Sequence, residues 1–392
     1  MKLACVIHRF GSQATGGSEA HCRDIAMRLA ARHDVTVLTS CATDYVTWRN
    51  VRPAGESMDG PVRVLRFPVD RTRRLNRFRE LSELVFANRA TADEHIEWFK
   101  ANGPSAPGLL EHLARRGSSY DRVLFWAFRY APVFFGLPLV ADRAILLPTA
   151  EDDELIRSST LLGPFFRRPR GYLFLTPEER DLVAGRCDGP LPPSEIIGIG
   201  LDAPAAVPPR RRLDELGVPH DFLLYLGRVD KNKGCDRMFD AYARYDAETT
   251  AAGASAPLPL VVAGPVVLPV PGHPRIRSLG FVDDATRDAL LAHATTLIMP
   301  SPFESLSIVI LEAWNRGRPV IVNGRCAPLA GQVTRANGGV FYKWPSEFVE
   351  AVRYVSAHRD IADRLGAQGR AYIEREYRWP LVLNKIEAIL AR

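Results

Sequence analysis

Short apolar segments of strand length alternate with longer segments of helical periodicity along the chain. Leu3–Ile7 and residues 35–38 are apolar runs separated by a polar loop and a helical pattern, and a dense run at residues 222–226 restarts the series. Such repeats predict parallel sheets that are doubly wound by helices. We expect strands at residues 3–7, 35–38, 62–67, 123–126, 144–147, 172–175, 195–199, 222–226, 258–263, 276–279, 297–299 and 319–322.

The two series indicate two domains. A chain of 392 residues exceeds what one compact core usually supports, and the Pro- and Ala-rich stretch 203–210 is typical of a linker. We therefore expect an α/β protein with two Rossmann-like doubly wound domains, residues 1–200 and 201–376, facing across a cleft, and a last amphipathic helix in residues 377–392. The first domain should also contain a helical segment at residues 71–113, broken at 103–105.

The stretch from Thr296 to Asn323 predicts a strand, a loop, a helix and a further strand. Ser307 is the expected helix cap, and Gly317 the expected helix end. The start of such a helix attracts phosphate, because its N–H groups lack partners and carry partial positive charge. Glu304 lies in the loop and Glu312 eight positions later. Ionised carboxylates only accept hydrogen bonds, which suits vicinal sugar hydroxyls. The alternative is that both are solvated surface acids.

Two further loops contain features suited to phosphate. Arg228 and Lys233 lie in a Gly-bounded loop directly after a predicted strand, which is suited to a diphosphate. Gly16 and Gly17 precede a predicted helix in the polar loop 9–18, where they would allow a phosphate to approach the backbone. Ordinary loop charge and a plain turn are the respective alternatives. The diglycine does not match the G-x-G-x-x-G dinucleotide fingerprint, which argues against a dehydrogenase.

Composition adds constraints on compartment and partners. The chain is 46% hydrophobic, and no apolar run is long enough to span a membrane. Its six cysteines lack C-x-x-C pairing, which favours reduced cytosolic thiols over disulfides or a zinc site. The net charge is +6, with arginines clustered at residues 71–79 and 167–170 beside aromatics. These clusters fit an anionic acceptor or an anionic membrane surface, or else a solvated helix face. Nucleic acid is disfavoured, because no binding module accompanies them.

The combination of these motifs resembles the retaining glycosyltransferases of family 4, which have the GT-B fold. The resemblance covers nearly the whole length of the chain. The matching segments are the Gly16-Gly17 loop, Pro148-Thr149-Ala150, residues 174–180, residues 198–202, Gly227-Arg228 to Lys233-Gly234, Phe303-Glu304-Ser305-Leu306 to Glu312-Ala313-Trp314, and Tyr377-Arg378-Trp379. In the family, the last helix crosses back to the first, acceptor-binding domain, and the second domain binds the nucleotide sugar.

The resemblance implies a role for each matching residue. Arg228 and Lys233 would bind the donor diphosphate, Glu304 the donor sugar and Glu312 the ribose hydroxyls. The remaining expected donor contacts are the backbone of Ser305, Leu306 and Ser307 near the sugar and phosphate, Gly16 and Gly17 at the diphosphate, and Gly264 and Val282 near the base.

One departure concerns the donor sugar. The family commonly has a histidine after the strand that here ends Leu147-Pro148-Thr149-Ala150, whereas this chain continues Glu151-Asp152-Asp153-Glu154. Glu151 stands in the histidine's place, or the match shifts by one residue. Glu151 and Asp152 are therefore candidates for contact with the donor sugar or the acceptor. An acidic helix start is the alternative for Asp153 and Glu154.

The expected reaction moves a hexose-type sugar from a UDP- or GDP-linked donor to an acceptor hydroxyl with retention of anomeric configuration. No D-x-D motif is present to hold a divalent cation, so we expect a metal-independent enzyme without a cofactor. The acceptor is a carbohydrate, a lipid-linked sugar or a small molecule of polysaccharide or glycoconjugate biosynthesis. We expect a cytoplasmic protein, with peripheral contact at the inner membrane face as an option. The alternative functions are a nucleotide-sugar epimerase on the same fold and a non-catalytic sugar-nucleotide-binding homologue.

Overall fold

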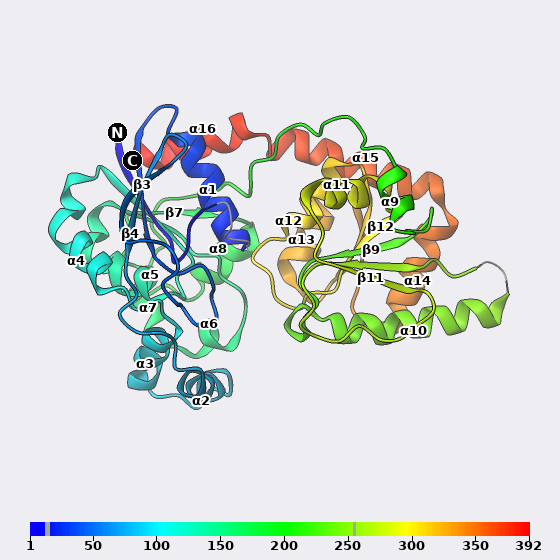
Figure 1. Cartoon of the computed structure of the whole chain (residues 1–392), viewed down its shortest axis with the longest axis horizontal. Coiled ribbons are helices and arrows are strands. Elements are labelled where there is room, and N and C mark those ends of the chain that lie inside the picture. Colours follow the sequence, from blue (N-terminus) through cyan, green and yellow to red (C-terminus); the bar gives the residue numbers. More distant parts are fainter. Residues whose placement is uncertain (12–15, 254–255) are drawn as a thin grey trace. The chain divides into compact units, whose positions relative to one another are not determined.

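The computed structural model describes residues 1–11, 16–253 and 256–392 (Figure 1). Residues 12–15 of the loop before Gly16, and residues 254–255 of the second-half loop, lie outside the described residues. The chain divides into two compact units. The first comprises Met1–Ile199 together with Leu383–Arg392, and the second comprises Gly200–Val382.

The first unit is built on an eight-stranded sheet with the order β3-β4-β2-β1-β5-β6-β7-β8. All pairs are parallel except β3 with β4. The strands are β1 (Lys2–Val6), β2 (Asp34–Ser40), β3 (Gly55–Asp59), β4 (Val62–Phe67), β5 (Arg122–Trp126), β6 (Ala144–Leu147), β7 (Gly171–Phe174) and β8 (Ser194–Ile196). The strand order reverses between β1 and β5, and doubly wound sheets bind ligands beyond the carboxyl ends of their strands at such a point.

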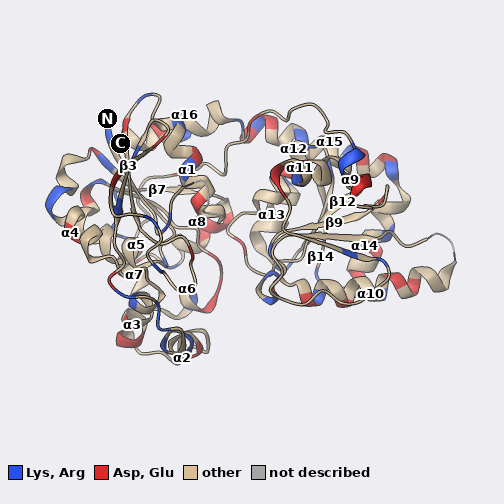
Figure 2. Ribbon diagram, in the orientation of Figure 1, with Lys and Arg blue, Asp and Glu red and all other residues tan. Residues whose placement is uncertain are grey.

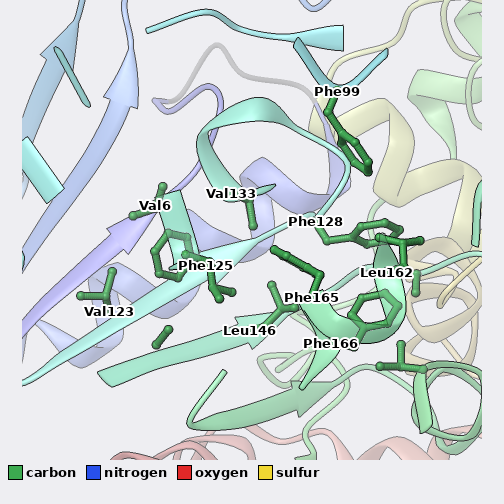
Figure 3. Close-up of a cluster of buried hydrophobic side chains, with 14 of the residues drawn as sticks. Val6, Phe99, Val123, Phe125, Phe128, Val133, Leu146, Leu162, Phe165 and Phe166 are labelled. Atoms are coloured by element: carbon green, nitrogen blue, oxygen red, sulfur yellow. The ribbon is translucent and has the colours of Figure 1, made fainter. Parts of the chain in front are cut away.

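Helices cover this sheet and form its core with it. They are α1 (Gly17–Leu29), α2 (Leu75–Phe86), α3 (Ala92–Asn102), α4 (Pro107–Arg116), α5 (Ala131–Gly136), α6 (Glu154–Ser158), α7 (Leu162–Phe166) and α8 (Pro177–Ala184). Figure 3 shows Phe125 of β5 and Leu146 of β6 among the buried side chains of this core, together with Phe165 and Phe166 of α7. The rings of Phe128 and Phe166 meet edge to face at 5.3 Å between centroids. These aromatics fix the segments that follow β5 and β6.

The second unit has a six-stranded parallel sheet with the order β11-β10-β9-β12-β13-β14. Its strands are β9 (Leu223–Leu226), β10 (Leu260–Ala263), β11 (Ile276–Gly280), β12 (Thr296–Met299), β13 (Val320–Asn323) and β14 (Gly339–Tyr342). This is the Rossmann arrangement, in which the strand order reverses between β9 and β12. The loops after these two strands are therefore the expected ligand loops of this unit.

Helices also surround the second sheet. They are α9 (Arg211–Glu215), α10 (Cys235–Ala252), α11 (Asp284–His293), α12 (Ile308–Asn315), α13 (Ala327–Ala336), α14 (Pro345–Ala357) and α15 (Arg359–Glu376). The division between the units falls within the last helix, α16 (Trp379–Leu390). Its end packs on the first unit, where Glu387 accepts a hydrogen bond from His33 at 2.9 Å.

The structure differs from the sequence expectations in a few elements. β3 and β14 were not predicted, because GESMD has no strong apolar alternation and GVFY is a four-residue segment directly after a Gly. The expected long helix also breaks at residues 87–91, where Asn88 has a positive φ and Thr91 caps α3 with a capping box. Ser307 does occupy the N-cap of α12, but its side chain makes no capping hydrogen bond.

Candidate active site

The loops after β9 and β12 approach each other closely at the reversal point of the second sheet. Gly234, at the end of the β9 loop, has φ +72°, and a Cβ there would lie 2.6 Å from the carbonyl oxygen of Pro300, directly after β12. Only glycine allows both this backbone conformation and this approach. The close packing brings Lys233, on the β9 loop, beside Glu304, on the β12 loop.

Lys233 and Glu304 form an ion pair. The Lys233 Nζ donates to Glu304 Oε1 at 2.7 Å, and the two side chains are 31% and 13% exposed. Arg228 lies on the same β9 loop with its Nε 3.0 Å from Asp230 Oδ2. Asp230 also accepts a hydrogen bond from the backbone N–H of Asn232, which starts the 3₁₀ turn Lys231–Lys233. Two half-buried cations are thus held on one short loop by carboxylates.

The loop after β12 is held in place by a residue that the sequence reasoning missed. The Asn323 side-chain amide, at the end of β13, donates to the carbonyl oxygens of Pro300 at 3.2 Å and Ser301 at 3.4 Å. The sequence did contain a signal for this role, because Asn323 is a polar residue at the end of an apolar strand. Beyond this anchor the backbone runs through the buried Ser305, Leu306 and Ser307 into α12. The first turn of α12 supplies N–H groups without intrahelical partners.

Glu312 lies on the second turn of α12 and forms an ion pair with Arg287 of α11. Burial raises the pKa of the Glu312 carboxyl, although Arg287 acts in the opposite direction. Arg287 was not identified from the sequence, because an arginine within an amphipathic helix has no motif around it. The contact joins α11 and α12 at the same edge of the sheet.

Gly264 and Val282 lie on the β10 and β11 side of the reversal point. Gly264 has φ +136°, and a Cβ there would lie 2.0 Å from the carbonyl oxygen of Gly227, beside Arg228. The N–H of Gly264 donates to the carbonyl oxygen of Gly280 at 2.7 Å. Val282 is half-buried in the loop between β11 and α11. Gly264 therefore contacts the Arg228 loop directly, whereas Val282 lies further out in the sheet order.

In the first unit, Gly16 has a structural role of its own. A Cβ on Gly16 would lie 2.1 Å from Glu19 Oε2. The Glu19 carboxylate forms an ion pair with Arg9 and accepts a hydrogen bond from His8 Nε2 at 3.0 Å. Burial acts to raise the pKa of Glu19, but the charge and hydrogen bond of His8 and the charge of Arg9 outweigh it and lower the pKa to about 2. Gly17 begins α1. Gly16 thus makes room for a buried ion pair.

The acidic segment after β6 is also paired internally. Arg129 Nη1 donates to Asp153 Oδ2 at 2.6 Å and its Nη2 lies 3.8 Å from Glu151 Oε2. Asp152 forms a two-point ion pair with Arg157 at 2.8 Å for each hydrogen bond. Asp153 caps α6. The helix-start interpretation therefore fits Asp153 and Glu154, the first residue of α6, whereas Glu151 lies beside Arg129.

Buried Glu179 supports the same segment. Its two carboxyl oxygens accept the backbone N–H groups of Ala150 and Leu175, each at 2.7 Å. Burial raises the pKa of Glu179 to about 8, against the effect of these N–H donors. Glu179 thereby fixes Thr149, which has a positive φ of 47°, and the start of the acidic segment.

The described part of the chain comprises residues 1–11, 16–253 and 256–392. No group of three or more His, Cys, Asp or Glu side chains in these ranges is arranged to hold a metal ion. No helix in the same ranges has the length and apolar character needed to cross a membrane. All six cysteines carry free thiols.

The whole chain is similar in fold to several solved structures. The chain is similar to sucrose-phosphate synthase from Thermosynechococcus elongatus (17% identity, TM-score 0.71, 99% of this chain and 98% of that chain). It is also similar to Anabaena HepE in complex with UDP and glucose (14%, 0.69, 100% and 99%) and to WaaG, a glycosyltransferase involved in lipopolysaccharide biosynthesis (16%, 0.66, 99% and 99%). The expected fold, GT-B with two Rossmann-like domains, is confirmed.

A family match falls within the second unit. Residues 220–358 match the family described as glycosyl transferases group 1. The search of curated proteins finds no match to this chain. The matched segment contains Arg228, Lys233, Glu304 and Glu312. This match supports the recognised resemblance to group 1 glycosyl transferases, and the GT-B fold of the whole chain agrees with it.

Proposed function

We propose that this chain transfers a hexose from a UDP- or GDP-linked donor to an acceptor hydroxyl, with retention of anomeric configuration and without a metal ion. The observation that carries the proposal is the pairing of the Arg228–Lys233 loop with the Glu304 loop at the reversal point of the second sheet. Lys233 Nζ is 2.7 Å from Glu304, so a cation for phosphate and an acceptor for sugar hydroxyls lie side by side.

In this proposal the bond between the anomeric carbon and the phosphate oxygen breaks, and its electron pair passes to the diphosphate. The acceptor oxygen bonds to the anomeric carbon from the face that the diphosphate leaves, and its proton passes to a phosphate oxygen. Arg228, Lys233 and the first turn of α12 stabilise the charge on the leaving group. Glu304 accepts hydrogen bonds from the sugar hydroxyls, and Glu312 from the ribose. No protein nucleophile is required.

Several remaining assignments belong to the same proposal. Ser305, Leu306 and Ser307 contribute backbone N–H groups near the sugar and phosphate, and Gly264 and Val282 border the base. In the first unit, Gly16 and Gly17 leave the backbone open to phosphate, and Glu151 and Asp152 contact sugar or acceptor. We place the reaction in the cytoplasm, because the six thiols are free.

The choice of a UDP-linked hexose draws support from similar structures. HepE was solved in complex with UDP-glucose, and a trehalose-6-phosphate protein from E. coli was solved bound with UDP-2-fluoro glucose. Those structures are 15% and 11% identical to this chain. At this identity they support the fold directly and the ligand only by analogy.

The test begins with a thermal-shift screen of UDP, GDP and their sugars, which fixes the donor. The donor is then incubated with candidate acceptors in the presence of EDTA, and the product's anomeric configuration is read by NMR. We expect nucleoside diphosphate release and a product with the donor's anomeric configuration. An inverted product, or activity that EDTA abolishes and a divalent cation restores, would contradict the proposal. Isomerised free sugar without any acceptor would indicate an epimerase instead.

A further inference from the structure

A basic cavity of about 330 Å³ opens in the first unit beside α2 and α3. This volume is at the lower end of the range for small-molecule sites, roughly 300–1,000 Å³. Figure 2 shows Lys and Arg, in blue, along α2 and the segment that leads into it. The charged side chains that line the cavity are Arg71, Arg73, Arg74, Arg77, Lys100 and Glu97. Five cations thus face a single carboxylate.

The cations differ in how they are already engaged. Glu97 pairs with Lys100 at 2.8 Å, and Arg77 lies 3.4 Å from Glu80, which does not line the cavity. Arg71 lies 4.0 Å from Asp70. The Arg74 side chain makes no hydrogen bond or ion pair within the described part of the chain. The cavity therefore retains an excess of positive charge that its own acids do not neutralise.

The floor of the cavity, formed by Trp48 and Arg73, is held by hydrogen bonds and ring contacts. Trp48 is buried with a positive φ of 58°, a conformation that a bulky residue adopts only when its surroundings impose it. Its indole Nε1 donates to the carbonyl oxygen of Asn102 at 2.7 Å. Arg73 donates to the same oxygen and lies over the rings of Trp48 and Phe78, 5.1 and 4.4 Å from their centroids. These contacts hold Arg73 in one position before any ligand arrives, which lowers the entropy cost of binding.

Burial lowers the pKa of Arg73 to about 10, while Tyr130, Asp44 and Tyr45 act in the opposite direction. A buried cation whose ionised form is disfavoured in this way gains free energy from an added anion. The burial of Arg73 and the excess positive charge of the cavity therefore both favour the binding of an anion.

The cavity adjoins the ligand end of the first sheet. The side-chain amide of Asn102 donates to the carbonyl oxygen of Arg129 at 2.9 Å, in the segment after β5. Trp48 meets the rings of His8, after β1, and Tyr130, after β5, at 5.8 Å in both cases. β1 and β5 are the strands between which the order reverses. A ligand group held in this cavity would therefore lie next to the reversal point of the first unit.

We propose that the acceptor bears a phosphate group, as a monoester or diester, and that this cavity binds it through Arg74, Arg77 and Arg71 above a floor of Arg73 and Trp48. Arginine is suited to this role, because its planar guanidinium makes paired hydrogen bonds to phosphate oxygens. The inference rests on the proposed glycosyl transfer, and it adds the chemical class of the acceptor.

The test measures binding to the full chain by calorimetry at constant ionic strength. The probes are a hexose 6-phosphate, the same hexose without phosphate, and vesicles of phosphatidylcholine with or without phosphatidic acid. The test variant is Arg74→Gln with Arg77→Gln. The control is Arg79→Gln, which removes an exposed arginine on the same helix that does not line the cavity. Circular dichroism checks that all variants fold.

We expect one phosphate-bearing probe to bind to the wild type. The affinity of the double variant for this probe should be lower by roughly tenfold or more, because the variant loses charge-assisted hydrogen bonds. Arg79→Gln should bind like the wild type. Binding of the hexose 6-phosphate indicates a soluble acceptor, and binding only of the phosphatidic acid vesicles indicates a lipid-borne phosphate. Equal affinity in the double variant and the wild type, or no phosphate-dependent binding to either probe, would overturn the inference.

UDP binding is measured on the same samples and reports on the second unit. Loss of phosphate binding in the double variant with UDP binding retained separates the two sites. If UDP and its sugars fail to bind the wild type while the phosphate probe binds, the proposed glycosyl transfer is contradicted. The assignment of the cavity as a phosphate site is then retained. If UDP binds and the phosphate probes do not, the cavity assignment fails alone.

Discussion

The two units have the same kind of strand reversal, but they use charge there in opposite ways. In the first unit, Arg9 and Glu19 form an ion pair after β1 with side chains 8% and 5% exposed, and the rings of His8 and Tyr130 stack at 3.7 Å. In the second unit, Lys233 and Arg228 are about one-third exposed. The same topological position thus holds an internal network in one unit and accessible cations in the other.

The difference indicates which charges serve the fold and which serve a ligand. A buried pair is costly to break, because the remaining charge is left without water or partner. A half-exposed pair contributes little to stability, so its residues can be replaced without unfolding. Variants of the Arg9–Glu19 pair should therefore lower the free energy of unfolding. Variants of Lys233 or Arg228 should instead lower donor affinity or turnover.

Glu19→Gln should have the largest effect. It leaves Arg9 buried without its counter-charge, and we expect a loss of about 3–5 kcal/mol in the free energy of unfolding, measured by urea denaturation at pH 7. Asp24→Asn, an exposed acid on the same helix, should cost less than about 0.5 kcal/mol. Equal losses in the two variants would contradict the role of the network.

The pH dependence of this network has a defined sign. Because the pKa of Glu19 is lowered to about 2 in the folded state, its stabilisation is complete above the unfolded pKa of about 4.3 and disappears as the pH falls toward 2. The stability gap between wild type and Glu19→Gln should therefore narrow across this range. A gap that stays constant would show that the carboxylate charge is not the cause.

Lys233→Ala should reduce turnover by about 10²–10³-fold, corresponding to roughly 2.7–4 kcal/mol of lost leaving-group stabilisation. Its melting temperature should stay within about 2 °C of the wild type, because the side chain is partly exposed. Lys231→Ala, on the same 3₁₀ turn and exposed, is the control and should retain wild-type turnover. A wild-type rate in Lys233→Ala would remove Lys233 from the mechanism.

Gly234→Ala tests the close approach of the loops after β9 and β12. A Cβ would meet the Pro300 carbonyl oxygen at 2.6 Å, whereas Gly253, with a similar φ of +65°, has nothing within 4 Å. Gly234→Ala should therefore cost about 1–3 kcal/mol more in unfolding free energy than Gly253→Ala, measured in denaturant. Nucleotide affinity should fall in Gly234→Ala only. Similar costs at both positions would leave backbone conformation as the sole reason for glycine.

Glu312→Gln should have the smallest effect. It retains the size of the side chain but weakens the contact with Arg287 and, in the proposed function, the contact with the ribose hydroxyls. We expect the nucleotide affinity to fall by about tenfold, or about 1.4 kcal/mol. Calorimetry with the preferred nucleoside diphosphate measures the change. The control is Asp284→Asn, which changes an exposed acid at the start of α11. The same loss of affinity in this variant would show that the effect comes from the loss of a nearby negative charge and not from Glu312 itself.

The sequence was most informative where local pattern and chemistry coincide. Strands at residues 62–67 and 144–147 have the expected bounds, and Thr176 caps α8 with Pro177 at its first position. The alternation of strands and helices in both units is confirmed with the fold, but the strand order, and with it the reversal between β9 and β12, was not predicted. The neighbourhood of Lys233 and Glu304 depended on recognising the family, because nothing local in either loop specifies the other.

The rest depends on long-range contacts that no local pattern records. Glu19 pairs with Arg9, ten positions away in the sequence, and Glu312 pairs with Arg287, 25 positions away. Neither spacing belongs to a sequence motif. The residues that line the basic cavity lie between Trp48 and Ser105 in the sequence. Trp48 among them has a positive φ that no sequence pattern predicts. The arginine cluster was visible in the sequence, but its arrangement around a cavity required the fold.

The most direct test of the account compares nucleoside diphosphate with nucleoside monophosphate binding in wild type and Lys233→Ala. Calorimetry gives the affinity gained from the second phosphate, for the base that the wild type prefers. If the second unit binds the donor by its diphosphate, the wild type should prefer the diphosphate by at least about tenfold, and Lys233→Ala should lose most of this preference. An undiminished preference in Lys233→Ala, or equal wild-type affinity for both nucleotides, would contradict it.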